Sequence, residues 1–153
     1  MATTVQFPLF DGTDTLVRKD RRELTDRRLQ RSKLNWQRNQ PKVEADRLTL
    51  LYRGQEFKVE ADTLDEPFTL GRSSKCHLTV NNSYTSNYHA QIEHFEGEFV
   101  LTDHSMNGTY IESAREGKYH VAGDKIYIYG EGIISLGTPR KFSEHDLIQY
   151  RCE

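Results

Sequence analysis

Polar residues that could bind a phosphate group gather between positions 71 and 108 of this 153-residue chain. Arg72 follows a glycine, so a guanidinium group stands beside a backbone position that has no Cβ atom. Ser86 and Asn87 offer a hydroxyl and a carboxamide, and Asn107, just before another glycine, offers a second carboxamide. A planar guanidinium can donate two parallel hydrogen bonds to phosphate oxygens, and neutral donors can complete such a site. These residue types therefore predict the binding of a phosphate group and of the peptide backbone that carries it.

The segments between these polar residues have the pattern of β-strands. Apolar side chains alternate with polar ones from Cys76 to Val80 and again from Ala90 to Ile92. A period of two indicates a strand with one buried face. The Asn-Gly dipeptide that begins at Asn107 is a strong signal for a tight turn. We therefore expect the polar residues to lie in loops that a rigid sheet holds at one edge.

Three short motifs in this region resemble those of the forkhead-associated (FHA) domain, a phosphothreonine-recognition module. They are G-R-x-x-x-C at 71–76, S-x-x-H at 86–89 and D-x-S-x-N-G-T at 103–109. The motifs occur in the order and spacing of the family, and the resemblance extends from about Arg47 to the C-terminus. It implies a two-sheet antiparallel β-sandwich in a protein of the small bacterial type that has a single FHA domain.

The resemblance also implies roles for four residues. Arg72 and Ser86 match the arginine and the serine with which the family contacts phosphate. Asn87 stands where the family often has arginine, so it is expected to bond the phosphate or the peptide backbone. Asn107 matches the asparagine that holds the main chain of the ligand. Structural support of this site is expected from Gly71, His89, Ser105 and Gly108.

Met106 departs from the family pattern, in which threonine or another polar residue often precedes the asparagine. One hydroxyl contact is therefore missing, which bears on affinity or on the preference for flanking residues. A hydrolase triad of Ser86, His89 and Asp103 would need a nucleophile elbow and an oxyanion-hole motif, and the sequence has neither. The six histidines lack Cys/His metal spacing, and no Walker loop is present. We therefore expect no catalytic residue, metal or cofactor.

The rest of the chain supports the same fold class. About ten short stretches with the pattern of strands lie between residues 48 and 151, and no helical stretch is predicted after residue 45. Many short strands with turn residues between them indicate a β-sandwich. We therefore expect an all-β FHA domain at 46–153 after a basic, mostly irregular tail and linker at 1–45.

Charge is distributed unevenly between these two parts. Residues 1–38 hold nine Lys/Arg and five Asp/Glu, a net of +4, whereas residues 39–153 hold twelve and eighteen, a net of -6. The leucines of the tail form a poor apolar stripe, so a stable isolated helix is not expected there. A basic segment can bind nucleic acid or an anionic membrane. The interspersed acids and the single aromatic at 18–38 instead favour a solvated tail, or one that lies across the acidic domain.

Other features of the sequence bear on its compartment. No apolar run approaches the ~20 residues that span a bilayer, and the N-terminus lacks the pattern of a secretory signal. Two cysteines, Cys76 and Cys152, without an export signal are expected to remain reduced thiols. We therefore expect a cytoplasmic protein.

The expected function is non-catalytic recognition of a phosphothreonine-containing protein in a Ser/Thr kinase pathway, with no nucleic-acid or membrane partner. One alternative is a phospho-independent scaffold or dimerisation module, in which Met106 has left the pocket without a ligand. A second alternative is self-recognition, because Thr25 lies in the basic segment and, once phosphorylated, could occupy the pocket of its own or a neighbouring chain.

Overall fold

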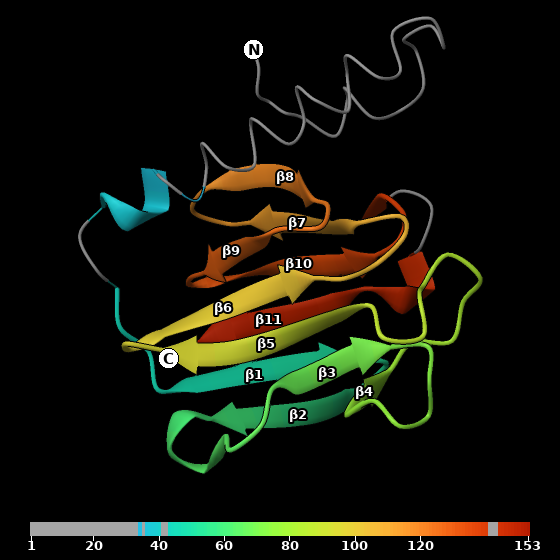
Figure 1. Cartoon of the computed structure of the whole chain (residues 1–153), viewed down its shortest axis with the longest axis horizontal. Coiled ribbons are helices and arrows are strands. Elements are labelled where there is room, and N and C mark those ends of the chain that lie inside the picture. Colours follow the sequence, from blue (N-terminus) through green and yellow to red (C-terminus); the bar gives the residue numbers. More distant parts are fainter. Residues whose placement is uncertain (1–33, 35, 41–42, 141–143) are drawn as a thin grey trace, which may run out of the picture.

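The computed structural model describes residue 34 and residues 36–40, 43–140 and 144–153 of the chain (Figure 1). The expectations for an irregular basic tail and for Thr25 concern residues that fall largely outside this part.

Eleven strands lie in the part of the chain that the structure describes. In chain order they are β1 (Arg47–Tyr52), β2 (Gln55–Glu60), β3 (Phe68–Gly71), β4 (Leu78–Thr79), β5 (Ala90–Phe95), β6 (Glu98–Asp103), β7 (Thr109–Ser113), β8 (Gly117–Val121), β9 (Lys125–Ile128), β10 (Glu131–Leu136) and β11 (Ile148–Cys152). One sheet has the strand order β2-β1-β11-β10-β7-β8 and the other has the order β4-β3-β5-β6-β9 (Figure 1). Except for the short parallel pair of β3 with β4, the described strand pairs are antiparallel. The predicted β-sandwich is confirmed.

The core lies between the two sheets and follows the alternation of the sequence. In β1, Leu48 and Leu50 are fully buried, and their antiparallel partners in β11 are Cys152 and Tyr150. In the opposite sheet, Ile92 of β5 is fully buried as well. Fully burying a side chain of this size contributes about 1.5–3 kcal/mol to the free energy of unfolding. Packing of these inward-facing side chains fixes the strands, and the fixed strands position the loops at the ends of the sheets.

In the part of the chain that the structure describes, two three-residue 3-10 helices lie between strands, η3 (Ala61–Thr63) and η5 (Glu144–Asp146). The sequence predicted an all-β domain with no helical stretch after residue 45, and the described residues there lie in strands and loops apart from such short turns. Each of these helices is only three residues long and buries no side chain, so neither has an apolar periodicity that a sequence could reveal.

Part of the segment that was expected to be a tail belongs to the folded body. Leu34 and residues 36–38 are helical, and Leu34 and Gln37 are buried. The carboxamide of Gln37 donates to the carbonyl of Tyr127 and accepts from the amide of the same residue, both at 2.9 Å. Its amide nitrogen also donates to Glu116 at 2.9 Å. One side chain thus makes the two bonds that a neighbouring strand would make with the edge strand β9.

The described residues contain no helix that is long and apolar enough to cross a membrane. Cys76 and Cys152 are both free thiols, as the sequence predicted. Burial raises the pKa of the Cys152 thiol to about 12, so this group is protonated at neutral pH.

Candidate functional site

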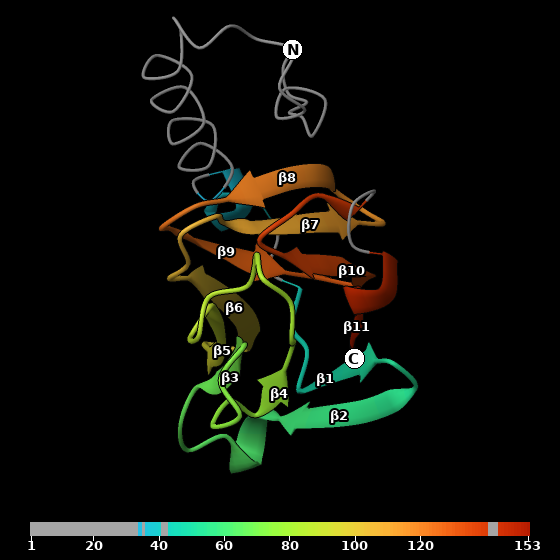
Figure 2. The ribbon, with the colours of Figure 1, turned by 90° about the vertical axis from the view of Figure 1, so that its right-hand side faces the viewer.

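Three loops meet at one end of the sandwich, the end that faces the viewer in Figure 2. They connect β3 to β4, β4 to β5 and β6 to β7. Two backbone bonds join the first pair of loops, from the amide of Arg72 to the carbonyl of Ser86 at 2.9 Å and from Ser73 to Asn87 at 3.1 Å. A Cβ atom at Gly71 would lie 2.2 Å from the carbonyl oxygen of Asn87. Glycine is therefore needed here because the two backbones approach so closely.

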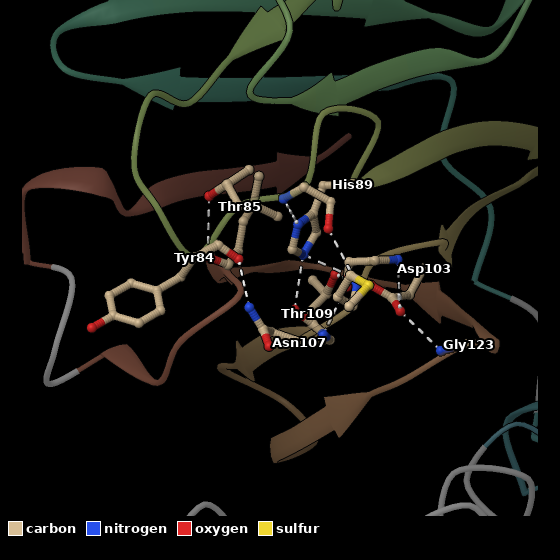
Figure 3. Close-up of polar contacts among 12 residues, drawn as sticks. Tyr84, Thr85, His89, Asp103, Asn107, Thr109 and Gly123 are labelled. Carbon is tan, nitrogen blue, oxygen red and sulfur yellow. Dashed lines mark hydrogen bonds and ion pairs between the residues drawn. The ribbon is translucent and has the colours of Figure 1, made fainter.

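Side chains join the third loop to the second. The hydroxyl of Ser86 accepts a hydrogen bond from the amide of Met106 at 3.1 Å. The carboxamide nitrogen of Asn107 donates to the carbonyl of Tyr84 at 3.0 Å, a contact that Figure 3 shows directly. Ser86 is thus bonded to both of the other loops, to Arg72 through its carbonyl and to Met106 through its hydroxyl.

The four residues that the sequence singled out have capacity left for a ligand. Arg72, Asn87 and Asn107 are exposed and Ser86 is half-buried. The guanidinium of Arg72 makes no hydrogen bond or ion pair with any residue that the structure describes. The Ser86 hydroxyl can still donate its proton, and Asn107 keeps its carbonyl oxygen and one N–H. Such a set of one cation and several neutral donors can hold an anion at the surface.

His89 braces the site from behind. The ring is fully buried, and Nδ1 accepts from the amide of Ser86 at 3.0 Å. The proton therefore sits on Nε2, which donates to the carbonyl of Gly108 at 2.8 Å. Burial lowers the pKa of His89, so the ring is neutral at pH 7. Because both ring nitrogens bond to backbone groups, neither can take the hydroxyl proton of Ser86. His89 Nε2 lies 3.8 Å from Asp103 Oδ1, which is beyond hydrogen-bond distance, so the hydrogen bonds of a Ser-His-Asp triad are not formed.

The buried carboxylate of Asp103 organises the third loop (Figure 3). One carboxylate oxygen accepts from the hydroxyls of Ser105 and Thr109, both at 2.7 Å. The other accepts from the amide of Gly123 at 2.8 Å and from that of Ser105 at 3.3 Å. The Ser105 hydroxyl in turn accepts from the amide of Gly108 at 2.7 Å. The support expected from Ser105 is therefore part of a larger network, centred on an aspartate that the motif D-x-S-x-N-G-T already contained.

His120 is a supporting residue that sequence reasoning missed. Its ring stacks on Tyr110 with centroids 4.2 Å apart, and its Nε2 donates to the carbonyl of Asn107 at 3.1 Å. Gly108 has a φ of 88°, and a Cβ atom there would lie 2.0 Å from this nitrogen. The only signal in the sequence was the glycine, because the strand that supplies the ring begins nine residues later at Gly117.

Residues 68–129 match the family model of the FHA domain, so the chain contains an FHA domain. The matched segment includes all four candidate residues. A comparison with curated protein sequences gives no match.

Solved structures of FHA domains have the same fold. The Rv1747 FHA-1 domain of Mycobacterium tuberculosis is 21% identical, with a TM-score of 0.54, over 71% of this chain and 97% of that chain. An FHA domain of an Arabidopsis thaliana protein is 16% identical, with a TM-score of 0.53, over 75% and 92%. The MEK1 FHA domain, solved with a phosphothreonine peptide of HOP1, is 19% identical, with a TM-score of 0.53, over 69% and 96%.

Proposed function

We propose that this FHA domain binds phosphothreonine-containing segments of a partner protein and catalyses no reaction. The observation that carries the proposal is the exposed guanidinium of Arg72, which has no partner among the described residues and lies on loops bonded through Ser86. A surface arginine in that position is available to an external anion.

The chemistry of a phosphothreonine side chain suits these groups. Its phosphate carries about -1.5 to -2 charges at pH 7 and three strong acceptor oxygens. Arg72 would donate two parallel bonds to it, and Ser86 and Asn87 would add neutral donors. Asn107 would hold the peptide backbone with its free carbonyl oxygen and N–H. The complex of the MEK1 FHA domain with a phosphothreonine peptide supports this assignment by analogy of fold.

Such a ligand must be made by a Ser/Thr kinase, so the domain would act in kinase-dependent signalling. The geometry of His89 supports a role in binding alone. Its two nitrogens are committed to the backbone at Ser86 and Gly108.

The test is a titration with a degenerate phosphothreonine peptide library, followed by the tightest single peptide, its phosphoserine analogue and its unphosphorylated form. We expect phosphorylation-dependent binding that Arg72→Ala weakens about 30-fold to several thousand-fold, the usual cost of truncating such a charged anchor. Arg72→Lys should recover only part of the affinity, because an ammonium cannot donate two parallel bonds. Arg151→Ala, at an exposed position in β11, is the matched control and should bind like the wild type.

Two results would contradict the proposal. One is an absence of binding to any phosphothreonine peptide. The other is a partner affinity that survives both phosphatase treatment and Arg72→Ala, which would instead identify a phospho-independent scaffold.

A further inference from the structure

A second polar cluster lies next to the candidate site and is not part of it. Its centre is Asp146, the last residue of η5, whose side chain is 14% exposed. One oxygen of its carboxylate accepts from the hydroxyl of Tyr52 at 2.8 Å and from the guanidinium of Arg53 at 3.0 Å. The other oxygen accepts from the carboxamide nitrogen of Asn82 at 3.2 Å. Through Asp146 of η5, the end of β1 and the β1–β2 turn are thereby joined to the β4–β5 loop.

Asn82 also forms hydrogen bonds within the β4–β5 loop. Its carboxamide oxygen accepts from the amide of Tyr84 and from the hydroxyl of Thr85, both at 2.9 Å. The orientation is unambiguous, because the carboxylate of Asp146 can only accept and must face the nitrogen of the Asn82 carboxamide. Hydrogen bonds from Tyr52, Asn82 and Arg53 outweigh the burial of Asp146 and keep its pKa below the usual value, so the group is ionised at neutral pH.

The chain of bonds ends at the candidate site. The backbone N–H of Tyr84 donates to Asn82, and the backbone carbonyl of Tyr84 accepts from Asn107 at 3.0 Å (Figure 3). The bond to Tyr84 turns the nitrogen of the Asn107 carboxamide inward and leaves the oxygen available outside. Gly137 lies directly against the Tyr84 carbonyl, because a Cβ atom at Gly137 would be 2.0 Å from the Tyr84 carbonyl oxygen.

We propose that Asn82 and Asp146 are positioning residues of the phosphopeptide site, which set the orientation of the Asn107 carboxamide through Tyr84 without touching the ligand. The inference rests on the proposed function. Its physical basis is pre-organisation, since a carboxamide that is already oriented loses less conformational freedom when it binds.

The decisive experiment exchanges donor and acceptor between the two side chains. Asn82→Asp alone sets two carboxylates against each other, and Asp146→Asn alone sets two amide nitrogens against each other or reverses Asn82. In the double variant, the new carboxylate still accepts from Tyr84, and the new carboxamide donates to it while accepting from Tyr52 and Arg53. Every donor is again matched with an acceptor.

We expect each single variant to weaken binding of the tightest library peptide about five- to tenfold, the effect of one misplaced hydrogen bond. The double variant should return to within about twofold of the wild type. Asn81→Asp, at the exposed neighbouring position, is the matched control for added charge and should have no effect beyond about twofold. In each variant the side-chain amide signals of Asn107 in a nitrogen–proton NMR spectrum should shift together with affinity.

Three outcomes are distinguishable. Single variants that bind like the wild type, or a double variant no better than the weaker single one, overturn the inference while Arg72-dependent binding stands. Variants that lose thermal stability but keep both affinity and the Asn107 signals reduce the cluster to a structural role, which also overturns it. A wild-type protein that binds no phosphothreonine peptide overturns this inference and the proposed function together.

Discussion

At the scale of single residues, Asp103 accepts more hydrogen bonds than a neutral side chain could. One oxygen of its buried carboxylate accepts hydrogen bonds from two hydroxyls, and the other oxygen accepts from backbone amides. In Asp103→Asn, an amide nitrogen must face one of these donor pairs. We expect a loss of about 1–3 kcal/mol in the free energy of unfolding, measured by urea denaturation. Asp62→Asn, at an exposed position in η3, should change it by less than about 0.5 kcal/mol, and equal effects would refute the explanation.

Gly71 sets the spacing between two of the loops that carry the candidate binding residues. A Cβ atom there would overlap the carbonyl oxygen of Asn87, so Gly71→Ala must push the first two loops apart. We expect a loss of about 1–3 kcal/mol of stability and a loss of peptide affinity in the same titration. Gly54→Ala is the contrast, because Gly54 has a φ of +80° but open space around it. That variant should be strained by about 1–3 kcal/mol yet bind peptide normally.

At the scale of elements, the edge strand β9 is closed by a side chain from the N-terminal segment. Gln37→Ala removes the partner of both backbone groups of Tyr127, and we expect it to lower the free energy of unfolding by about 1–3 kcal/mol. Gln37→Glu should cost more, because a carboxylate cannot donate to the Tyr127 carbonyl and lies against Glu116. Thermal denaturation checks this order, with the exposed Gln40→Ala as control. A glutamate variant more stable than the alanine variant would contradict the geometry.

At the scale of the whole molecule, the buried His89 and the half-buried His120 link stability to pH. Burial lowers the pKa of both His89 and His120 in the folded state. The unfolded chain therefore takes up protons below its own histidine pKa of about 6.5, where the folded state does not. Stability should be greatest above about pH 6.5 and should fall as the pH decreases below it. The slope reaches at most about 1.4 kcal/mol per pH unit for each histidine.

Urea denaturation between pH 7.5 and 5.5 measures this slope. His120→Phe keeps a ring to stack on Tyr110 but cannot titrate, so about half of the slope should disappear. Stability that stays constant or rises as the pH falls through this range would show that neither ring is held neutral.

Local patterns in the sequence predicted the strands, because a side-chain period of two is a property of each strand by itself. The same patterns placed Arg72, Ser86, Asn87 and Asn107 outside strands, and the structure has them in loops. Their role as ligand contacts stays a prediction. The network of Asp103 was foreshadowed by its motif, since Ser105 and Thr109 lie within six residues of it.

The sequence by itself determined the fold class and the loop positions of the candidate residues. Only the tertiary structure decided that Gln37 closes β9 and that Asp146 reaches the binding loop through Asn82. These contacts join residues 90 and 64 positions apart. Hydrogen bonds between residues so far apart in the sequence depend on how the sheets stack. Such bonds cannot be predicted from the periodicity of the sequence or from neighbouring residue types.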